Sequence, residues 1–315
     1  MEMIKDGIIG LCVADALGVP VEFLSRNFLQ RNPVVDMRGY GTYNQPPGTW
    51  SDDTSMTLCL LDSLTNGLDY ADMMRKFALW MNNAEYTAYD EVFDVGVTTG
   101  KALSEFAKGT DPLLCGGSGE YDNGNGSLMR ILPLIFHLRS FFGDVFAYND
   151  KAFDIIHNVS SLTHAHSRSH VACGIYLSVA NRLLESKNIN TAFSAGMNDA
   201  KRYYRSKNRY YDELAYFDRL YDDDFRYTAK ENIKSSGYVV DTLEAAFWCL
   251  LTTECYEDCV LKAVNLGEDT DTVAAVTGGL AGLFYGYKAI PEKWLKQIAR
   301  LDFIINLCEK AERVI

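Results

Sequence analysis

The sequence predicts an all-α protein, and three observations support that fold class. Apolar residues recur at intervals of three or four through most of the chain, as in Phe153, Ile156 and Val159, which places them on one face of a helix. Alternation of apolar and polar residues with a period of two, which indicates strands, is scarce. Several periodic runs follow a residue such as Asp69, whose carboxylate can accept hydrogen bonds from free N–H groups at a helix N-terminus.

The periodic runs define the predicted helices in chain order. Asp69 and Asn190 stand at the N-cap positions of two of them, and Ser127 stands at the start of a third. Pro133 falls inside that third helix, where it lacks an N–H donor and crowds the preceding turn, so we expect a kink there. The predicted helices span 3–18, 53–65, 69–82, 92–108, 127–139, 150–163, 168–186, 190–204, 211–221, 240–253, 256–265, 271–286 and 292–313.

One domain spanning residues 1–315 is expected. A chain of 315 residues can bury a large core without disulfides, and this one contains no low-complexity linker and no repeat of fixed period. Two long irregular stretches, 19–51 and 109–126, should carry the loops that shape a site. The tyrosine-rich segment 199–234 mixes basic and acidic residues, which favours solvated helices over a site for single-stranded nucleic acid.

The charge and the cysteines limit the classes of partner. A formal net charge of −12 disfavours binding to nucleic acids and to anionic membranes. The eight cysteines are scattered without a CxxC motif, so we expect reduced thiols instead of disulfides or a zinc site. The N-terminus lacks the pattern of a secretory signal, and no uncharged run is long enough to span a bilayer. We therefore expect a cytoplasmic protein whose partners are small molecules or other proteins.

Two short segments rich in acids and hydroxyls each stand at the entrance of a predicted helix. They are Trp50-Ser51-Asp52-Asp53-Thr54 and Asp269-Thr270-Asp271-Thr272. One interpretation is helix capping, because acids at a helix N-terminus are stabilised by the helix dipole. The other is a cation site, because two such clusters offer oxygen ligands without histidine or cysteine, a donor set that suits Mg²⁺, Mn²⁺ or Ca²⁺. Acids packed together would repel one another, and a divalent cation would neutralise them.

A glycine-rich segment and a group of histidines are the remaining candidates. The glycines between Asp122 and Ser127 would let backbone N–H groups approach a phosphate, although an ordinary turn has the same pattern. An HxH pair at the end of a strand would indicate a barrel metallohydrolase, but the segment before His164 is predicted to be helical. Histidines that hydrogen-bond a ligand or cap a helix are the favoured interpretation. The histidines concerned are His157, His164, His166 and His170.

Six motifs follow one another along the chain. They are GLCVADALG (10–18) with VEF (21–23), WSDDT (50–54), NGNGSLMR (123–130), THAH (163–166), SGYVVDTLEAA (236–246) and GEDTDT (267–272). In this order they resemble the ADP-ribosylglycohydrolase family, the group that includes dinitrogenase reductase-activating glycohydrolase. Three positions depart from residues that the family often has, because Ala14 and Glu268 stand in place of glycines and Ser51 stands in place of a threonine.

The resemblance implies an all-helical fold of the family's type, a single compact bundle, with two Mg²⁺ ions for which Mn²⁺ is an alternative. Glu22 is implied to lie in a mobile loop near the scissile bond. Proton transfer then falls to Glu22 or to a metal-bound aspartate, Asp53 or Asp269. The implied metal ligands are Ser51, Asp52, Asp53, Asp269, Asp271 and Thr272. The implied residues around ADP-ribose are Asn123, Gly124, Asn125, Gly126, Ser127, His164 and Tyr238.

These expectations favour a magnesium-dependent hydrolase that removes ADP-ribose from a modified protein side chain, with arginine as the first choice. Serine adducts or free ADP-ribose derivatives are the second choice. Two alternatives of another class stay open, namely a two-metal phosphoester hydrolase and a non-catalytic protein that binds ADP-ribose. The expected partners are ADP-ribosylated proteins and ADP-ribose, with no nucleic acid and no membrane.

Overall fold

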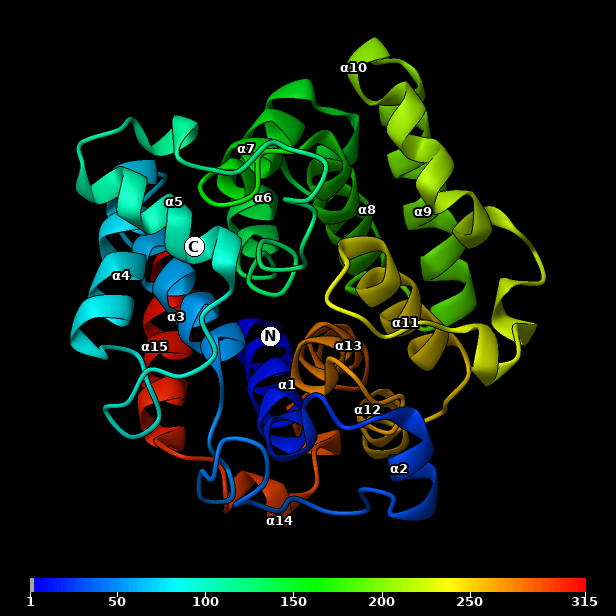
Figure 1. Cartoon of the computed structure of the whole chain (residues 1–315). Coiled ribbons are helices and arrows are strands. Elements are labelled where there is room, and N and C mark those ends of the chain that lie inside the picture. The colour runs from blue at the N-terminus through cyan, green and yellow to red at the C-terminus, as the bar shows by residue number, and fades with distance from the viewer. Residues whose placement is uncertain (1–2) are drawn as a thin grey trace.

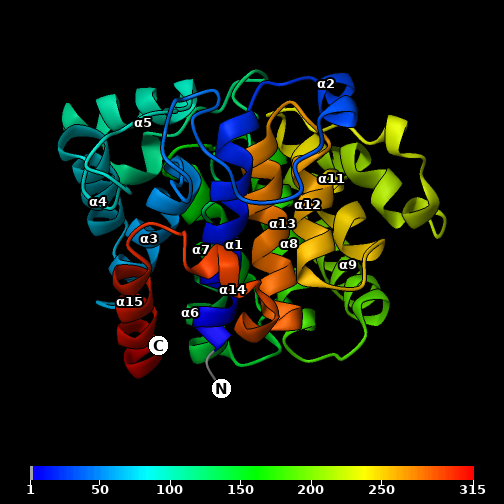
Figure 2. The same ribbon diagram turned by 90° about the horizontal axis from the view of Figure 1, so that it is seen from below.

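Two helices from opposite ends of the chain, α1 (Met3–Gly18) and α13 (Thr270–Tyr285), pack side by side at the centre of the protein (Figure 1, Figure 2). Their backbones approach closely, because a Cβ atom at Gly10 would lie 2.5 Å from the carbonyl oxygen of Gly278. A larger residue at either position would push the helices apart. The contact between α1 and α13 therefore fixes the helix ends on which the candidate site is built.

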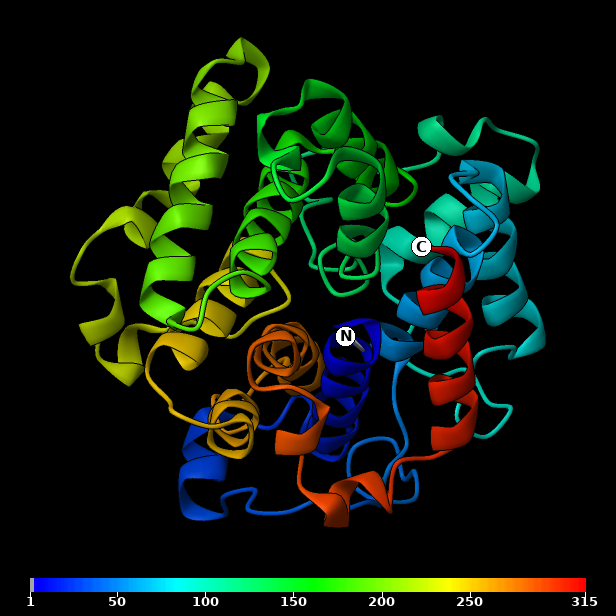
Figure 3. The same ribbon diagram turned by 180° about the vertical axis from the view of Figure 1, so that it is seen from behind.

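The computed structural model describes residues 3–315, and within that range it contains helices and no strand. The other α-helices are α2 (Arg26–Arg31), α3 (Asp52–Leu64), α4 (Tyr70–Asn83), α5 (Val97–Ala107), α6 (Leu134–Phe142), α7 (Asp150–Ser161), α8 (Ser167–Leu183), α9 (Ile189–Arg205), α10 (Asn208–Tyr211), α11 (Val239–Leu251), α12 (Tyr256–Val264), α14 (Glu292–Leu295) and α15 (Leu301–Val314). Helices α3, α4, α5 and α15 lie on one side of the central pair, and α8, α9 and α11 lie on the other (Figure 1, Figure 3). The all-α prediction is confirmed.

The buried apolar side chains form one continuous cluster that runs from Ile4 to Ala311 along the chain. Burial of this apolar surface is the main stabilising contribution to the fold. The cysteines are all unpaired in the described residues, and only Cys255 among them is exposed. Within residues 3–315, none of the helices combines the length and the apolar character needed to cross a bilayer.

The prediction for the segment 127–139 is wrong at its start. Residues 127–130 form turns, and α6 begins only at Leu134. Pro133 is the N-cap of α6, where a missing N–H removes no hydrogen bond, so it starts the helix instead of kinking it. Ser127 is consequently not an N-cap.

Other boundary errors coincide with irregular backbone. Helix α5 begins at Val97 and not at residue 92, because Asp94 before it has a left-handed conformation (φ 54°). The segment 292–313 is two helices, α14 and α15, divided at Arg300, whose φ is 48°. The segment Asp212–Tyr221 is a 3₁₀ helix, a geometry that the apolar spacing does not separate from an α-helix.

Two helix caps test the N-cap predictions directly. The Asp69 carboxylate accepts a hydrogen bond from the N–H of Asp72 and caps α4, as predicted. The cap of α9 is Asn188, which accepts from Thr191, and the prediction of Asn190 is wrong by two positions. The sequence analysis does not predict the short helix α2, because six residues are too few to show the apolar spacing of a helix.

Candidate active site

The first acid cluster stands at the N-terminus of α3. The free N–H groups of this helix end are bound by the side chains of Ser51 and Asp15, and not by Asp52 or Asp53. The Ser51 hydroxyl accepts from the N–H of Asp53 over 3.2 Å. Asp15, from α1, accepts from the N–H groups of Ser51 over 3.1 Å and of Thr54 over 3.0 Å. Because Ser51 and Asp15 satisfy these donors, the carboxylates of Asp52 and Asp53 are not needed as caps. The capping interpretation therefore applies to Ser51 and leaves both aspartates free for another role.

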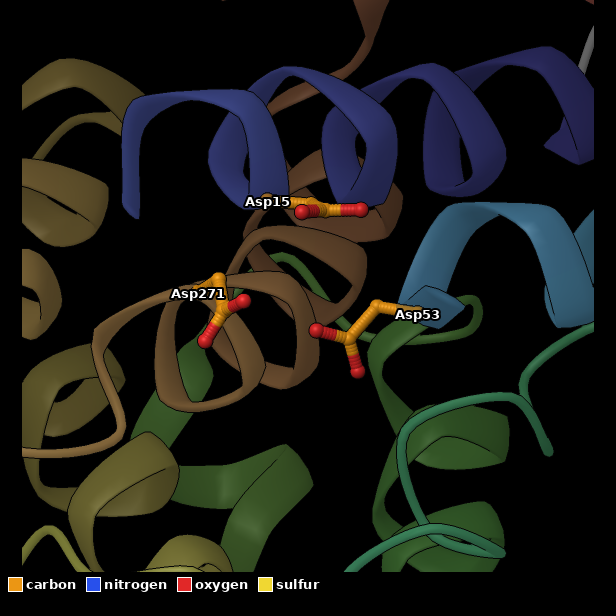
Figure 4. Close-up of side chains that lie close together, drawn as sticks. All are labelled: Asp15, Asp53 and Asp271. Atoms are coloured by element: carbon orange, nitrogen blue, oxygen red, sulfur yellow. The ribbon is translucent and has the colours of Figure 1, made fainter. Parts of the chain in front are cut away.

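The second acid cluster reaches the first through the end of α1. A Cβ atom at Gly18 would lie 2.4 Å from the Cα of Asp271, so the glycine allows α13 to begin directly against α1. Asp15, Asp53 and Asp271 then converge from α1, α3 and α13 (Figure 4). One carboxylate oxygen from each lies within 4.8 Å of the other two.

A second group of three acids adjoins this one and shares Asp271 with it. One oxygen each from Glu22, Asp269 and Asp271 again lies within 4.8 Å of the others. The segments 50–54 and 269–272 thus meet in space, more than two hundred residues apart in the sequence. Their contiguous carboxylates can hold more than one hard cation.

The loop that carries Glu22 is fastened to the residue before Asp269. The N–H of Phe23 donates to the carbonyl of Glu268 over 2.6 Å, and the N–H of Glu268 donates to the carbonyl of Leu24 over 2.8 Å. Phe23 (φ 64°) and Glu268 (φ 65°) both have left-handed backbones, which gives a physical reason for the glycine that the family often has at position 268. The two hydrogen bonds hold Glu22 against the acids.

Four carboxylate oxygens in these two groups are buried and have no hydrogen-bond partner among the described residues. They are Glu22 Oε2, Asp53 Oδ1, Asp269 Oδ1 and Asp271 Oδ2. Burial, and then the charges of neighbouring acids, raise the pKa of Glu22 to about 8 and the pKa values of Asp53 and Asp271 well above their usual range. Buried carboxylates without partners are strongly unfavourable, so this all-oxygen set fits a divalent cation.

A cavity of 260 Å³ opens beside these acids. The glycine segment forms part of its wall, and Asn125 from that segment donates to the Asp269 carboxylate over 2.9 Å. The wall is therefore tied to the second acid cluster. The sequence-predicted residues that line the cavity are Glu22, Asp52, Gly124, Asn125, Gly126, His164, Asp269 and Thr272.

The other sequence-predicted residues lie outside the cavity wall. Ser127 is fully buried and accepts a hydrogen bond from the Ser160 hydroxyl over 2.9 Å. The carbonyl of Asn123 accepts from the N–H of Val239 over 3.0 Å, which joins the glycine segment to the half-buried Tyr238 and α11. Ser127 and Asn123 therefore support the glycine segment from behind. The remaining predicted residues outside the wall are Ser51, Asp53 and Asp271, all of them buried.

Of the candidate histidines in the described residues, His164 alone lines this cavity. His166 is the N-cap of α8 and accepts from the N–H of Arg168 over 3.1 Å, so it caps a helix. His157 and His170 are hydrogen-bonded to tyrosine and serine hydroxyls. No histidine belongs to a group of potential metal ligands within residues 3–315, which agrees with the oxygen-only interpretation.

Three further residues belong to the site, and the sequence gives uneven signals for them. Asp94 lines the cavity, and burial together with the charge of Asp269 raises its pKa to about 6. Hydrogen bonding with the Tyr43 hydroxyl opposes the rise in the pKa of Glu22 and in that of Asp94. Asp15 had a visible signal, a single acid in the apolar run after residue 6. Tyr43 lies in the predicted irregular stretch 19–51, and Asp94 lies in the segment 92–96, for which the helical prediction is wrong, so no motif marks either residue.

Comparison with known proteins now decides the family. The family model described as ADP-ribosylglycohydrolase matches residues 1–315. The chain belongs to this family. ADP-ribosylarginine hydrolase Tri1 of Serratia proteamaculans is 32% identical over 312 residues, which cover 98% of this chain and 79% of that protein. The ADP-ribosyl-[dinitrogen reductase] glycohydrolase of Rhodospirillum rubrum is 29% identical over 295 residues, 92% of this chain and 88% of that protein.

A solved structure extends the agreement to three dimensions. It is described as an ADP-ribosylglycohydrolase-related protein complex, and it superposes with a TM-score of 0.79 and 29% sequence identity, covering 99% of this chain and 98% of that chain. The family resemblance drawn from the six motifs and the family's all-helical fold are both confirmed.

Proposed function

We propose that this protein is a magnesium-dependent hydrolase that removes ADP-ribose from arginine side chains of modified proteins. The observation that carries the proposal is the set of four buried, unpartnered carboxylate oxygens beside a cavity. Similarity to an ADP-ribosylarginine hydrolase over 98% of the chain supports arginine as the acceptor. The acidic cavity wall suits a cationic guanidinium, because Asp94 and Glu22 both line it.

The residues that would hold the ions are the six oxygen ligands Ser51, Asp52, Asp53, Asp269, Asp271 and Thr272. When bound, two Mg²⁺ ions, or Mn²⁺ in their place, would neutralise the acids and orient oxygen ligands such as water and ribose hydroxyls. Asp15 satisfies N-terminal donors of α3, so the Asp53 carboxylate, which lies beside that of Asp271, is not needed as a cap. Asn125 orients Asp269 through its 2.9 Å hydrogen bond.

The reaction breaks the bond between the ribose C1″ and a guanidine nitrogen and adds water at C1″. One proton leaves the attacking water, and one proton reaches the departing nitrogen. We assign this transfer to Glu22, an assignment supported by its carboxyl, which lines the cavity and lies within 4.8 Å of Asp269 and Asp271 oxygens. Gly124 and Gly126 line the cavity, where glycines would let the diphosphate and ribose approach the backbone closely.

Mass spectrometry of matched peptides tests this proposal. Peptides ADP-ribosylated on arginine or on serine are incubated with the enzyme and Mg²⁺, and a parallel set contains EDTA. We expect loss of the modification from the arginine peptide, and retention of it when EDTA is present. An Asp154→Ala variant, altered at an exposed acid of α7, is the matched control and should behave as the wild type.

Other outcomes separate the alternatives. Faster release from serine would overturn the arginine assignment and leave the hydrolase class intact. Full activity in EDTA would overturn the metal requirement. Unchanged peptides together with calorimetric binding of ADP-ribose would indicate a non-catalytic binding protein.

A further inference from the structure

Three side chains next to the cavity form a linear hydrogen-bonded chain that ends at His164. Arg130 lies three residues after Ser127, at the end of the NGNGSLMR motif, and is fully buried. Its Nη2 atom donates to the Thr163 hydroxyl over 2.8 Å and to the carbonyl of Val159 over 3.3 Å. Its guanidinium lies 4.7 Å from the centre of the Phe77 ring, so packing and hydrogen bonds both hold it in place. No acid forms an ion pair with Arg130 in the described residues.

The direction of the hydrogen bonds in this chain follows from chemistry. A guanidinium has donors and no acceptor, so the Thr163 oxygen must accept from Arg130. The Thr163 hydroxyl proton has no other acceptor among the described residues, so it is donated to His164 Nδ1, which lies 2.9 Å away. A nitrogen that accepts a hydrogen bond carries no proton. The neutral imidazole of His164 therefore has its proton on Nε2.

The Nε2 edge of His164 faces the cavity wall formed by the glycine segment. A Cβ atom at Gly126 would lie 2.7 Å from His164 Cε1 and 3.3 Å from Nε2, and one at Gly124 would lie 3.5 Å from Nε2. No protein group in residues 3–315 hydrogen-bonds Nε2, while Nδ1 is bonded to Thr163. Burial and the Arg130 charge lower the pKa of His164 to about 3, so the ring stays neutral at physiological pH.

We propose that Arg130 and Thr163 are positioning residues that fix His164 as an Nε2–H donor toward a phosphate or ribose oxygen of ADP-ribose. This inference rests on the proposed function. The cavity wall is rich in acceptors, because Glu22, Asp52, Asp94 and Asp269 all line it. An oxygen-rich ligand needs hydrogen-bond donors in this wall. A neutral N–H supplies one without adding another buried charge to that of Arg130. The opposite tautomer would turn a nitrogen lone pair toward the ligand oxygens, which is repulsive.

The tautomer is measured directly in the wild-type protein. Long-range ¹H–¹⁵N spectra of ¹⁵N-histidine-labelled protein distinguish a protonated ring nitrogen from an unprotonated one. We expect His164 to show a protonated Nε2 and an unprotonated Nδ1, with no titration between about pH 5 and about pH 8. A protonated Nδ1, or a His164 ring that titrates in this range, would overturn the proposal without any variant.

Thr163→Val removes the hydroxyl and keeps the shape of the side chain. We expect the affinity for ADP-ribose, measured by calorimetry, to fall about 3- to 10-fold, the worth of one neutral hydrogen bond. KM should rise with kcat nearly unchanged, and the spectra should show a mixed or inverted tautomer. Thr163→Ser keeps the hydroxyl and should restore both readouts.

Ser161→Ala is the matched control for Thr163→Val. It removes a neighbouring hydroxyl that lies 2.8 Å from His170 Nε2 instead of His164, so it should leave the His164 tautomer and ADP-ribose binding unchanged. If Thr163→Val binds ADP-ribose like the wild type, the proposal is wrong whatever the enzyme hydrolyses. If the predicted tautomer is found but no ADP-ribosylated peptide is cleaved, the proposed function fails and the arrangement of His164 stands.

Discussion

Two buried clusters of titratable side chains differ in whether their polar atoms have partners. In the acid cluster, Glu22, Asp53, Asp269 and Asp271 each leave one buried oxygen without a hydrogen bond in the described residues. The acids come from the loop after α1 and from the N-termini of α3 and α13. Nothing within residues 3–315 hydrogen-bonds these four oxygens.

In the histidine cluster, between α7, α8 and α9, the ring nitrogens are all paired. His157 Nε2 lies 3.0 Å from the Tyr204 hydroxyl, and His157 Nδ1 lies 3.0 Å from the Tyr210 hydroxyl. His170 Nε2 lies 2.8 Å from the Ser161 hydroxyl. The Tyr204 hydroxyl also donates to the carbonyl of His170 over 2.9 Å.

The difference teaches how to separate a structural cluster from a functional one. Buried polar groups in native proteins are nearly always satisfied, so the histidine cluster needs no ligand to be stable. The acid cluster is incomplete by the same rule, which supports the proposed divalent cation. Both clusters consist of residue types that can bind a ligand. They differ in whether their buried polar atoms already have hydrogen-bond partners in the protein.

Asp53→Ala should break the acid cluster with the largest effect. Loss of a proposed metal ligand removes several kcal/mol of ion binding and ribose positioning, so we expect turnover with Mg²⁺ to fall by more than about 10³-fold. The metal-free protein should be at least as stable as the wild type, because one buried, repelled carboxylate is gone. Kinetic assays and thermal melts in EDTA measure the two effects. A variant that unfolds in EDTA would indicate a structural role for Asp53.

Glu22→Gln should separate proton transfer from ion binding. The amide keeps the size of the side chain but cannot transfer a proton at neutral pH, so kcat should fall about 10²- to 10⁴-fold. Calorimetry should give an ADP-ribose affinity close to that of the wild type. A loss in kcat within about tenfold would assign the transfer to an aspartate such as Asp53 or Asp269.

Tyr204→Phe should break the histidine cluster and leave the chemistry intact. The substitution leaves His157 Nε2 without a partner and removes the additional hydrogen bond to the His170 carbonyl, which lies within α8. The unsatisfied ring nitrogen should cost about 1–3 kcal/mol of unfolding free energy. Urea denaturation measures the loss, and kcat per folded molecule should not change. Tyr211→Phe, at a residue that is 59% exposed, is the control and should be neutral. A stable but inactive Tyr204→Phe variant would contradict the structural interpretation.

The sequence predicts the helices and the acid motifs well, because each is encoded over a short stretch. Each acid motif is an unbroken run of a few residues, 50–54 or 269–272, so its acids and hydroxyls can be recognised from the sequence alone. Their convergence depends on the tight contact of Gly18 with Asp271, a tertiary fact that no local pattern contains. Only the family resemblance implies that the two segments contribute to one site.

The errors fall where local backbone geometry overrides periodicity. Pro133 is the N-cap of α6, where its missing N–H costs no hydrogen bond. Arg300 divides a periodic segment because its backbone is left-handed. Asp94 enters the cavity from an irregular loop that apolar spacing wrongly predicts as helical, so the sequence gives no sign of its place in the site. Ser127 has the residue type of a phosphate-binding loop but is fully buried. Its place is set by packing, which the motif alone does not show.

The two clusters should change the free energy of unfolding with pH in opposite directions. The change per pH unit is smaller than the effects expected for the three substitutions above. For Glu22 the folded pKa is about 8 against an ordinary value of 4.5. The folded, metal-free protein therefore keeps a proton that the unfolded chain loses, and its stability falls as pH rises from about 4.5 to about 8. For His170 the folded pKa is about 3 against 6.5. The unfolded chain then gains a proton first, and stability falls as pH drops below about 6.5.

Thermal melts in EDTA and in saturating Mg²⁺, from about pH 5 to about pH 9, measure both limbs. Each group contributes at most about 1.4 kcal/mol per pH unit, so we expect shifts of a few degrees in Tm. Mg²⁺ should raise Tm much more at the alkaline end, because the cation requires the ionised acids, and it should leave the acidic limb in place. Glu22→Gln cannot ionise and should flatten the alkaline limb in EDTA, whereas Tyr204→Phe should leave that limb unchanged. A metal-free protein whose Tm rises from neutral to alkaline pH would show that the acids ionise without a cation, and the contrast between the two clusters would then fail.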